Sequence, residues 1–187
     1  MRILSGSFGG RVLKSVDSPG CRPAMSKVRN ALFSMLEARG VVWNGLRVLD
    51  LFAGTGSVGF EALSRGAAEA CFVEADKAVA ACIGENARRL GLESEQARVY
   101  QQGVERFLKK RSQEPFDVIF ADPPYRMRLL PPALQAIVQR GWLREGGMLV
   151  AEVEKDLRVS EHEELPLVVD RNYGQTRILI WTRATGE

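Results

Sequence analysis

The sequence predicts an α/β fold, in which helices cover both faces of a doubly wound and mostly parallel sheet. From residue 46 onward, short apolar segments alternate with stretches of helical periodicity, as strands and crossover helices do. A glycine-rich loop at 53–59 follows the first apolar segment, and a polar loop at 122–125 follows a later one. Loops after neighbouring parallel strands meet at one edge of such a sheet, where these folds bind their ligands.

The N-terminal part precedes this alternation and predicts a small β-arm followed by a helix. Two short strands around several glycines are expected at 2–14, and a turn-rich stretch at 17–23. Apolar residues then recur at helical spacing and predict a helix over 25–39, with a stripe made of Val28, Leu32, Met35 and Leu36. Lys27 and Arg29 fall off its apolar stripe, so we expect both side chains to be free to meet phosphate.

The remaining strands and helices are expected to alternate along the chain. Strands are expected at 46–52, 70–73, 98–101, 116–121, 148–153 and 176–181. Helices are expected at 58–64, 77–90, 104–110 and 129–140. We therefore predict an N-terminal extension over 1–45 and an α/β domain over 46–187 that carries the candidate site.

Composition and length fit one soluble globular domain. The chain has 187 residues, of which 45% are hydrophobic and 26% are charged. No apolar run approaches the roughly 18 to 20 residues that span a bilayer, and the N-terminus lacks the apolar core of a signal peptide. We therefore expect a cytoplasmic protein that does not associate with membranes, and we expect a monomer.

Residues that bind metals or form histidine-dependent nucleophiles are scarce. The three cysteines lie too far apart for a paired-cysteine metal site, and their odd number argues against a disulfide framework. The single histidine, His162, has no second histidine with which to build a zinc site or a catalytic triad. The sequence therefore predicts no bound metal.

Positive charge is concentrated near the N-terminus. Residues 1–47 hold eight basic and two acidic side chains, a net charge of +6, whereas the whole chain carries +3 and the remainder therefore −3. This asymmetry predicts an N-terminal segment that faces a polyanion, with Arg11, Arg22, Lys27 and Arg29 as candidate contacts to RNA phosphates. A basic face that is only solvated is the alternative.

The glycine-rich loop is a candidate cofactor site. Its glycines permit a tight turn from strand to helix and let a ligand approach the backbone. The segment 54–59 matches the dinucleotide fingerprint, and Glu74 lies where a carboxylate accepts ribose hydroxyls of either a dinucleotide or S-adenosylmethionine. Asp50 favours the second cofactor, because a carboxylate repels pyrophosphate and attracts the positive sulfonium and ammonium groups. A glycine turn without any ligand is the structural alternative.

The tetrapeptide Asp122-Pro123-Pro124-Tyr125 is the candidate catalytic element. An exocyclic amine of a base is a poor nucleophile, because its lone pair is delocalised into the ring. A carboxylate that accepts one N–H and a backbone carbonyl that accepts the other orient this nitrogen toward a methyl donor. The prolines stiffen the loop, and Tyr125 offers a ring on which an extruded base stacks. A Pro-Pro turn that only closes a strand is the alternative.

Together, these motifs resemble those of the bacterial methyltransferases that modify guanine N2 at nucleotide 966 of 16S ribosomal RNA. The resemblance covers nearly the whole chain and rests on the segments 9–13, 22–33, 49–56, 61–67, 122–125 and 174–176. It implies a Rossmann-like, class I S-adenosylmethionine-dependent methyltransferase fold. The tetrapeptide alone is shared with DNA amine methyltransferases, so the N-terminal segments and the combination of motifs make the resemblance specific.

The resemblance also implies roles for individual residues. Cofactor contacts are implied for Asp50, Phe52, Ala53, Gly54, Thr55, Gly56, Glu74 and, through its backbone, Val104. Substrate contacts are implied for Asp122, Pro123, Pro124 and Tyr125. At Gly103-Val104 the family has Asp or Asn followed by Ala, so in this chain only main-chain groups can meet the adenine amine there. The implied partner is ribosomal RNA, either naked or within a small-subunit assembly intermediate.

Three other functions compete with RNA methylation. A DNA adenine or cytosine amine methyltransferase uses the same tetrapeptide, although 187 residues leave no room for a domain that reads base sequence. A noncatalytic RNA-binding assembly factor would retain the fold, but the intact glycine loop and tetrapeptide argue against it. A dehydrogenase would use the glycine loop for a nicotinamide cofactor.

Overall fold

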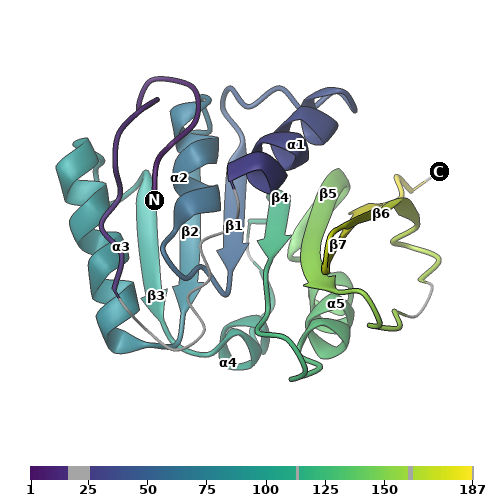
Figure 1. Ribbon diagram of the computed structural model, residues 1–187. Helices are drawn as coiled ribbons and strands as arrows, with labels where there is room; N and C mark the ends of the chain where they lie inside the picture. The colour runs from purple at the N-terminus through teal and green to yellow at the C-terminus, as the bar shows by residue number, and fades with distance from the viewer. Residues whose placement is uncertain (17–25, 113, 160–161, 187) are drawn as a thin grey trace.

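A central sheet organises the structure (Figure 1). The computed structural model describes residues 1–16, 26–112, 114–159 and 162–186. Within them the strands are β1 (Arg47–Leu51), β2 (Glu69–Glu74), β3 (Ala97–Gln101), β4 (Phe116–Ala121), β5 (Leu143–Glu154), β6 (Leu167–Tyr173) and β7 (Thr176–Thr182). They lie in the order β3-β2-β1-β4-β5-β7-β6. Strands β1 to β5 are parallel, whereas β7 is antiparallel to β5 and β6 to β7, so the predicted mostly parallel, doubly wound sheet is confirmed.

The strand order places a topological switch between β1 and β4. After β1 the chain moves outward through β2 and β3, and it then crosses back to β4 on the other side of β1. The two strands are parallel neighbours, and Leu51 pairs with Ala121 at their carboxyl ends. The loops that follow β1 and β4 therefore border one crevice at this edge of the sheet.

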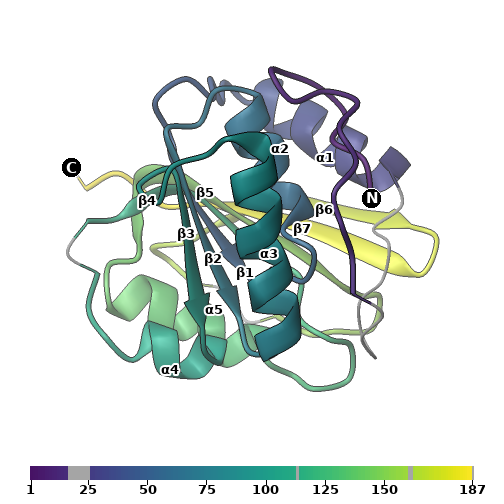
Figure 2. The same cartoon turned by 90° about the vertical axis from the view of Figure 1, so that its left-hand side faces the viewer.

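Helices cover both faces of the sheet (Figure 2). The described helices are α1 (Ser26–Glu37), α2 (Ser57–Ser64), α3 (Lys77–Leu90), α4 (Val104–Leu108) and α5 (Leu130–Gln139). Helices α1, α2 and α3 share one hydrophobic core with one face, and α4 and α5 share a second core with the other. Side chains alternate between the faces along each strand, so Val48 enters the first core and Leu49 the second. In the described ranges, no helix has both the length and the apolar character that a membrane span requires.

The N-terminal arm is less regular than the sequence predicts. A single antiparallel bridge, between Arg2 and Val12, stands where two short strands are expected over 2–14. The arm instead bonds to α2, whose buried Glu61 accepts hydrogen bonds from the backbone N–H groups of Leu4 (2.7 Å) and Ser5 (3.0 Å). The arm is therefore fixed both by this side chain and by backbone hydrogen bonds between its own two segments, such as those from the Ile3 N–H to the Arg11 carbonyl (2.9 Å) and from the Leu13 N–H to the Met1 carbonyl (2.7 Å).

Strand β6 is absent from the sequence prediction. Only Val169 is buried among its seven residues, so the strand shows no alternation of apolar and polar residues. It lies at the edge of the sheet and pairs with β7 alone. Its formation depends on that pairing, which a local pattern does not report. Strand β5 likewise begins at Leu143, five residues before the apolar run that predicts it.

The first turn of α2 packs against β2 at very short range. A Cβ atom on Gly59 would lie 2.3 Å from Cε1 of Phe72, and one on Gly56 would lie 2.8 Å from Cε2 of Phe60. The Phe60 and Phe72 rings themselves pack with centroids 4.8 Å apart. Glycine is therefore required at 59 for the helix to contact the strand, which is the role of the third glycine in a strand-to-helix fingerprint.

We predict that Gly59→Ala destabilises the fold by about 1–3 kcal/mol or more, because the added methyl group overlaps the Phe72 ring. Chemical denaturation measures the change. Gly84→Ala is the matched control: Gly84 lies within α3 and a Cβ there meets no atom within 4 Å. This control should stabilise the protein by up to ~1 kcal/mol through helix propensity. Equal effects of the two substitutions would contradict the packing argument.

Candidate active site

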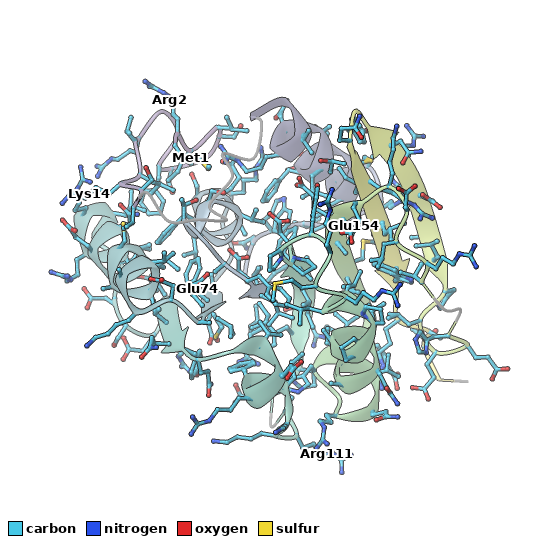
Figure 3. All side chains as sticks on the ribbon, turned by 60° about the horizontal axis from the view of Figure 1, so that its bottom comes forward. Met1, Arg2, Lys14, Glu74, Arg111 and Glu154 are labelled. Carbon is cyan, nitrogen blue, oxygen red and sulfur yellow. The ribbon has the colours of Figure 1, made fainter. Side chains whose placement is uncertain are left out.

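The two candidate loops meet at the carboxyl edge of the sheet, which Figure 3 turns toward the viewer. A cavity of about 90 Å³ lies between them. Its lining includes five of the predicted cofactor residues and one predicted catalytic residue: Asp50, Phe52, Ala53, Gly54, Thr55 and Asp122. Glu74 lies at the same edge, at the end of β2, and Glu154 lies there at the end of β5. The structure thus brings the glycine loop and the tetrapeptide into one site.

The glycine loop is a tight and strained turn. Phe52 has a left-handed backbone with φ +58°, which a residue with a side chain rarely adopts. The Ala53 N–H donates to the Val73 carbonyl (3.1 Å), and the Gly56 N–H donates to the Ala53 carbonyl (2.7 Å). Helix α2 then begins at Ser57 without a side-chain cap. Strain of this kind accumulates at ligand-binding turns, and residues 52–55 of this fixed turn line the cavity.

Asp50 is a buried carboxyl group that anchors α2. Its Oδ2 accepts the Gly59 N–H at 3.0 Å. Burial raises the pKa of Asp50 to about 8, and repulsion from Asp122 and Glu74 acts in the same direction, while the Gly59 hydrogen bond opposes the shift. Three carboxyl groups therefore act on one another at this edge, so the site is electrostatically suited to a cationic ligand.

Glu74 contacts the glycine loop directly. One oxygen of its carboxylate accepts the Gly54 N–H (2.9 Å) and the other accepts the Asp76 N–H (2.8 Å). Each carboxylate oxygen accepts more than one hydrogen bond, so these contacts leave capacity for ribose hydroxyls. Val104 lies apart from the cavity lining: its side chain is buried in the second core, and Gly103 precedes α4 without a side-chain cap.

The tetrapeptide follows β4 and is held by hydrogen bonds to β1 and β7. The Asp122 N–H donates to the Leu51 carbonyl of β1 (3.5 Å). The Tyr125 and Thr176 hydroxyl oxygens lie 3.0 Å apart, and the Thr176 hydroxyl donates to Oε1 of Glu152 (3.5 Å). Glu152 also lines the cavity. Residue patterns alone did not single out Thr176 and Glu152 as site residues; the segment 174–176 in the family resemblance was the available signal for Thr176.

The four predicted RNA contacts have different surroundings. Arg11 is exposed and donates to the Arg89 carbonyl (3.2 Å). Arg22 lies outside the described residues, and Lys27 belongs to α1 with its side chain outside the description. The expectation that Arg29 is free to meet phosphate is wrong, because its side chain is 2% exposed and lines the cavity.

Helical spacing explains the burial of Arg29. Phe33 and Leu36 follow it at positions i+4 and i+7, and both are fully buried against the first core. The stripe read from the sequence started at Val28 and passed over Phe33. Including that phenylalanine would have placed Arg29 on the buried face.

Comparison with known proteins agrees with this geometry. Residues 1–182 match the model of the family described as Conserved hypothetical protein 95. The chain belongs to this family. Ribosomal RNA small subunit methyltransferase D of Haemophilus influenzae is 37% identical over 175 residues, which are 93% of this chain and 89% of that protein. The protein of the same name in Escherichia coli K12 is 37% identical over 154 residues, which are 82% and 75%.

A solved structure shows the same fold. The structure described as "Putative methyltransferase yhhF from Escherichia coli" has a TM-score of 0.86 and 32% sequence identity, and the match covers 100% of this chain and 99% of that one. These matches confirm the resemblance to the small-subunit ribosomal RNA methyltransferases and the Rossmann-like methyltransferase fold.

We predict that Asp50→Asn removes a pH dependence of stability. The pKa of Asp50 is raised in the folded protein from 3.8 to about 8, so the unfolded chain loses this proton first and folding stability falls as pH rises from about 4 to about 8. Asparagine keeps an acceptor for the Gly59 N–H but never ionises. The melting temperature of the variant relative to wild type should therefore rise across this range and stay constant above it. A difference that does not vary with pH would refute the assignment.

Proposed function

We infer that this protein transfers a methyl group from S-adenosylmethionine to the exocyclic N2 of a guanine in small-subunit ribosomal RNA. The meeting of the glycine loop and Asp122 in one cavity is the observation that carries this proposal. The names of the curated relatives support ribosomal RNA as the substrate. The motif resemblance supports guanine N2 at nucleotide 966. The expected setting is the cytoplasm, with the protein acting as a monomer.

The charges of the site fit S-adenosylmethionine better than a dinucleotide. Glu74 and Asp122 place carboxylates beside the loop, which would repel a pyrophosphate, and their repulsion contributes to the raised pKa of Asp50. A cationic ligand would favour ionisation of Asp50, whereas a pyrophosphate would oppose it. S-adenosylmethionine has no phosphate and carries a sulfonium and an ammonium group. Backbone groups of 53–56 would hold its amino-acid part, and Glu74 would accept hydrogen bonds from its ribose. When bound, this cofactor supplies an electrophilic methyl group.

The tetrapeptide would position the acceptor amine. Asp122 would accept one N–H of the guanine amine, and the Pro123 carbonyl would accept the other, so that the nitrogen lone pair faces the methyl donor. Tyr125 would stack on the extruded base, with its ring orientation fixed through Thr176. Because an oriented pair reacts far faster than a diffusing one, positioning provides most of the advantage in this scheme.

Basic residues of the N-terminal segment are the proposed RNA contacts. Arg11 is exposed as such a contact requires. Arg22 and Lys27 stay in the proposal on the charge of the segment 1–45 alone, and Arg29 leaves it because it is buried. Whether naked RNA or an assembly intermediate is the better substrate follows from comparing both in the transfer assay.

Mass mapping of ribosomal RNA nucleosides, in cells with and without the gene, tests the function. We expect one N2-methylguanosine to disappear from the small-subunit RNA without the gene and to return when purified protein and S-adenosylmethionine are added. Duplex DNA in the same assay tests the DNA amine methyltransferase alternative. Unchanged RNA modification would refute the proposal.

Asp122→Ala should lower the rate of transfer by roughly a hundredfold or more while leaving cofactor affinity nearly intact, because the residue orients the substrate amine. Rate measurements at saturating cofactor and calorimetric binding separate the two effects. Glu145→Gln is the matched control, since Glu145 is an exposed carboxylate that lines neither this cavity nor the groove beside Tyr125. Near-normal turnover of the Asp122 variant would remove the residue from catalysis.

Glu74→Ala should weaken cofactor binding on the order of tenfold to a hundredfold, because a charged hydrogen bond contributes roughly 1.5–3 kcal/mol. The variant also removes the acceptor of the Gly54 N–H, which fixes the loop. The rate at saturating cofactor should change less than the affinity. Calorimetric titration checks the prediction, and wild-type affinity would exclude Glu74 from the site.

A further inference from the structure

Arg29 contributes a buried cation to the wall of the cavity. It lies in the first turn of α1, far from the glycine loop in sequence, yet it lines the same cavity as Thr55 and Asp122. Its side chain is 2% exposed. The function proposed above gives no role to this charge.

The guanidinium of Arg29 is incompletely satisfied. One terminal nitrogen donates to the Arg2 carbonyl, and the other contacts Sδ of Met1, a weak acceptor. Its Nε is buried and has no hydrogen-bond partner among the residues that the structure describes. None of the ion pairs that join residues in the described ranges includes Arg29. Burial lowers the pKa of Arg29, because desolvation disfavours the charged form, and the charge of Glu61 opposes this shift.

Glu61 does not provide the missing counter-ion. Its field favours the charged form of Arg29, but its carboxylate is engaged elsewhere. It accepts the N–H groups of Leu4 and Ser5 and pairs with Nε of Arg65 at 3.0 Å. Within the described ranges no carboxylate therefore pairs with Arg29, and its side chain lines the cavity.

We propose that Arg29 binds the carboxylate of the methionyl part of S-adenosylmethionine, so that α1 forms one wall of the cofactor site. This inference rests on the proposed function, which supplies the ligand. A carboxylate matches the planar donors of a guanidinium, and pairing in a buried site strengthens the contact. The cavity then offers carboxyl groups to the cationic parts of the cofactor and a guanidinium to its anionic end.

An RNA phosphate is the other anion that Arg29 could bind. The cavity measures about 90 Å³, and Arg29 is almost inaccessible beneath the N-terminal arm. A phosphate in a polymer backbone cannot enter such a space without its neighbours, whereas a carboxylate at the end of a small molecule can. The geometry therefore favours the cofactor.

Calorimetric binding of S-adenosylmethionine and of its decarboxylated form tests the proposal. The second ligand keeps the sulfonium and ammonium groups and lacks only the carboxylate. Wild type should prefer S-adenosylmethionine on the order of tenfold to a hundredfold, as expected for a charged hydrogen-bonded pair. Arg29→Met should abolish this preference by weakening S-adenosylmethionine alone. Arg29→Lys, which keeps a cation and serves if the methionine variant fails to fold, should show a reduced preference.

Arg65→Gln is the matched control. Arg65 is a largely buried arginine that pairs with Glu37 and Glu61 and does not line the cavity. This variant should lower the melting temperature and retain the wild-type preference. If Arg29 has only a structural role, Arg29→Met should also keep the wild-type preference, because it would weaken the binding of both ligands equally.

The remaining outcomes separate this inference from the proposed function. Equal binding of the two ligands by wild type would overturn the role of Arg29 and leave the cofactor assignment intact. Binding of neither ligand would overturn both. If Arg29→Met weakens RNA affinity and keeps the ligand preference, the anion is an RNA phosphate and the inference is wrong.

Discussion

The site depends on the close approach of α2 to β2. Gly59 lies against the Phe72 ring with no space for a Cβ atom, and this contact fixes the direction in which α2 leaves the glycine loop. The same residue donates its N–H to buried Asp50, so the end of β1 and the first turn of the helix are joined by one hydrogen bond. The backbone between them must then close through left-handed residues, including Phe52. Helix packing thus sets the geometry of the loop that borders the cavity.

Helix α2 also positions the N-terminal segment. Its buried Glu61 holds the arm at Leu4 and Ser5, and the arm carbonyl of Arg2 in turn holds Arg29 of α1. A continuous series of contacts therefore runs from β2 through α2 and the arm to the far wall of the cavity. The N-terminal segment differs from the rest of the chain in its charge. Through its packing against α2, it also forms part of the cavity wall.

The sequence predicts most clearly those elements whose pattern reports their own burial. The expected bounds of α3 and β4 agree with the structure, and the loops after β1 and β4 meet as expected. Strand β6 is missed because its stability comes from a partner strand rather than from its own alternation. Arg29 is predicted to be exposed because its side chain is charged. Phe33 and Leu36 follow it at helical spacing, however, and all three residues are buried. The error at β6 thus reflects pairing with another strand, whereas the error at Arg29 reflects a local apolar stripe from which Phe33 was left out.

Two buried ionisable groups of opposite sign line the cavity without pairing. Asp50 and Arg29 are each almost inaccessible, and neither takes part in an ion pair between residues of the described ranges. Burial disfavours the charged form of both, which lowers the stability of the fold. A direct pair between them would relieve that cost, but it would also occupy the two groups that a ligand with separated charges needs. Keeping them apart holds the site ready for an amino-acid group, whose ammonium and carboxylate lie at different atoms. The destabilisation is thus a consequence of preorganising the cavity for binding.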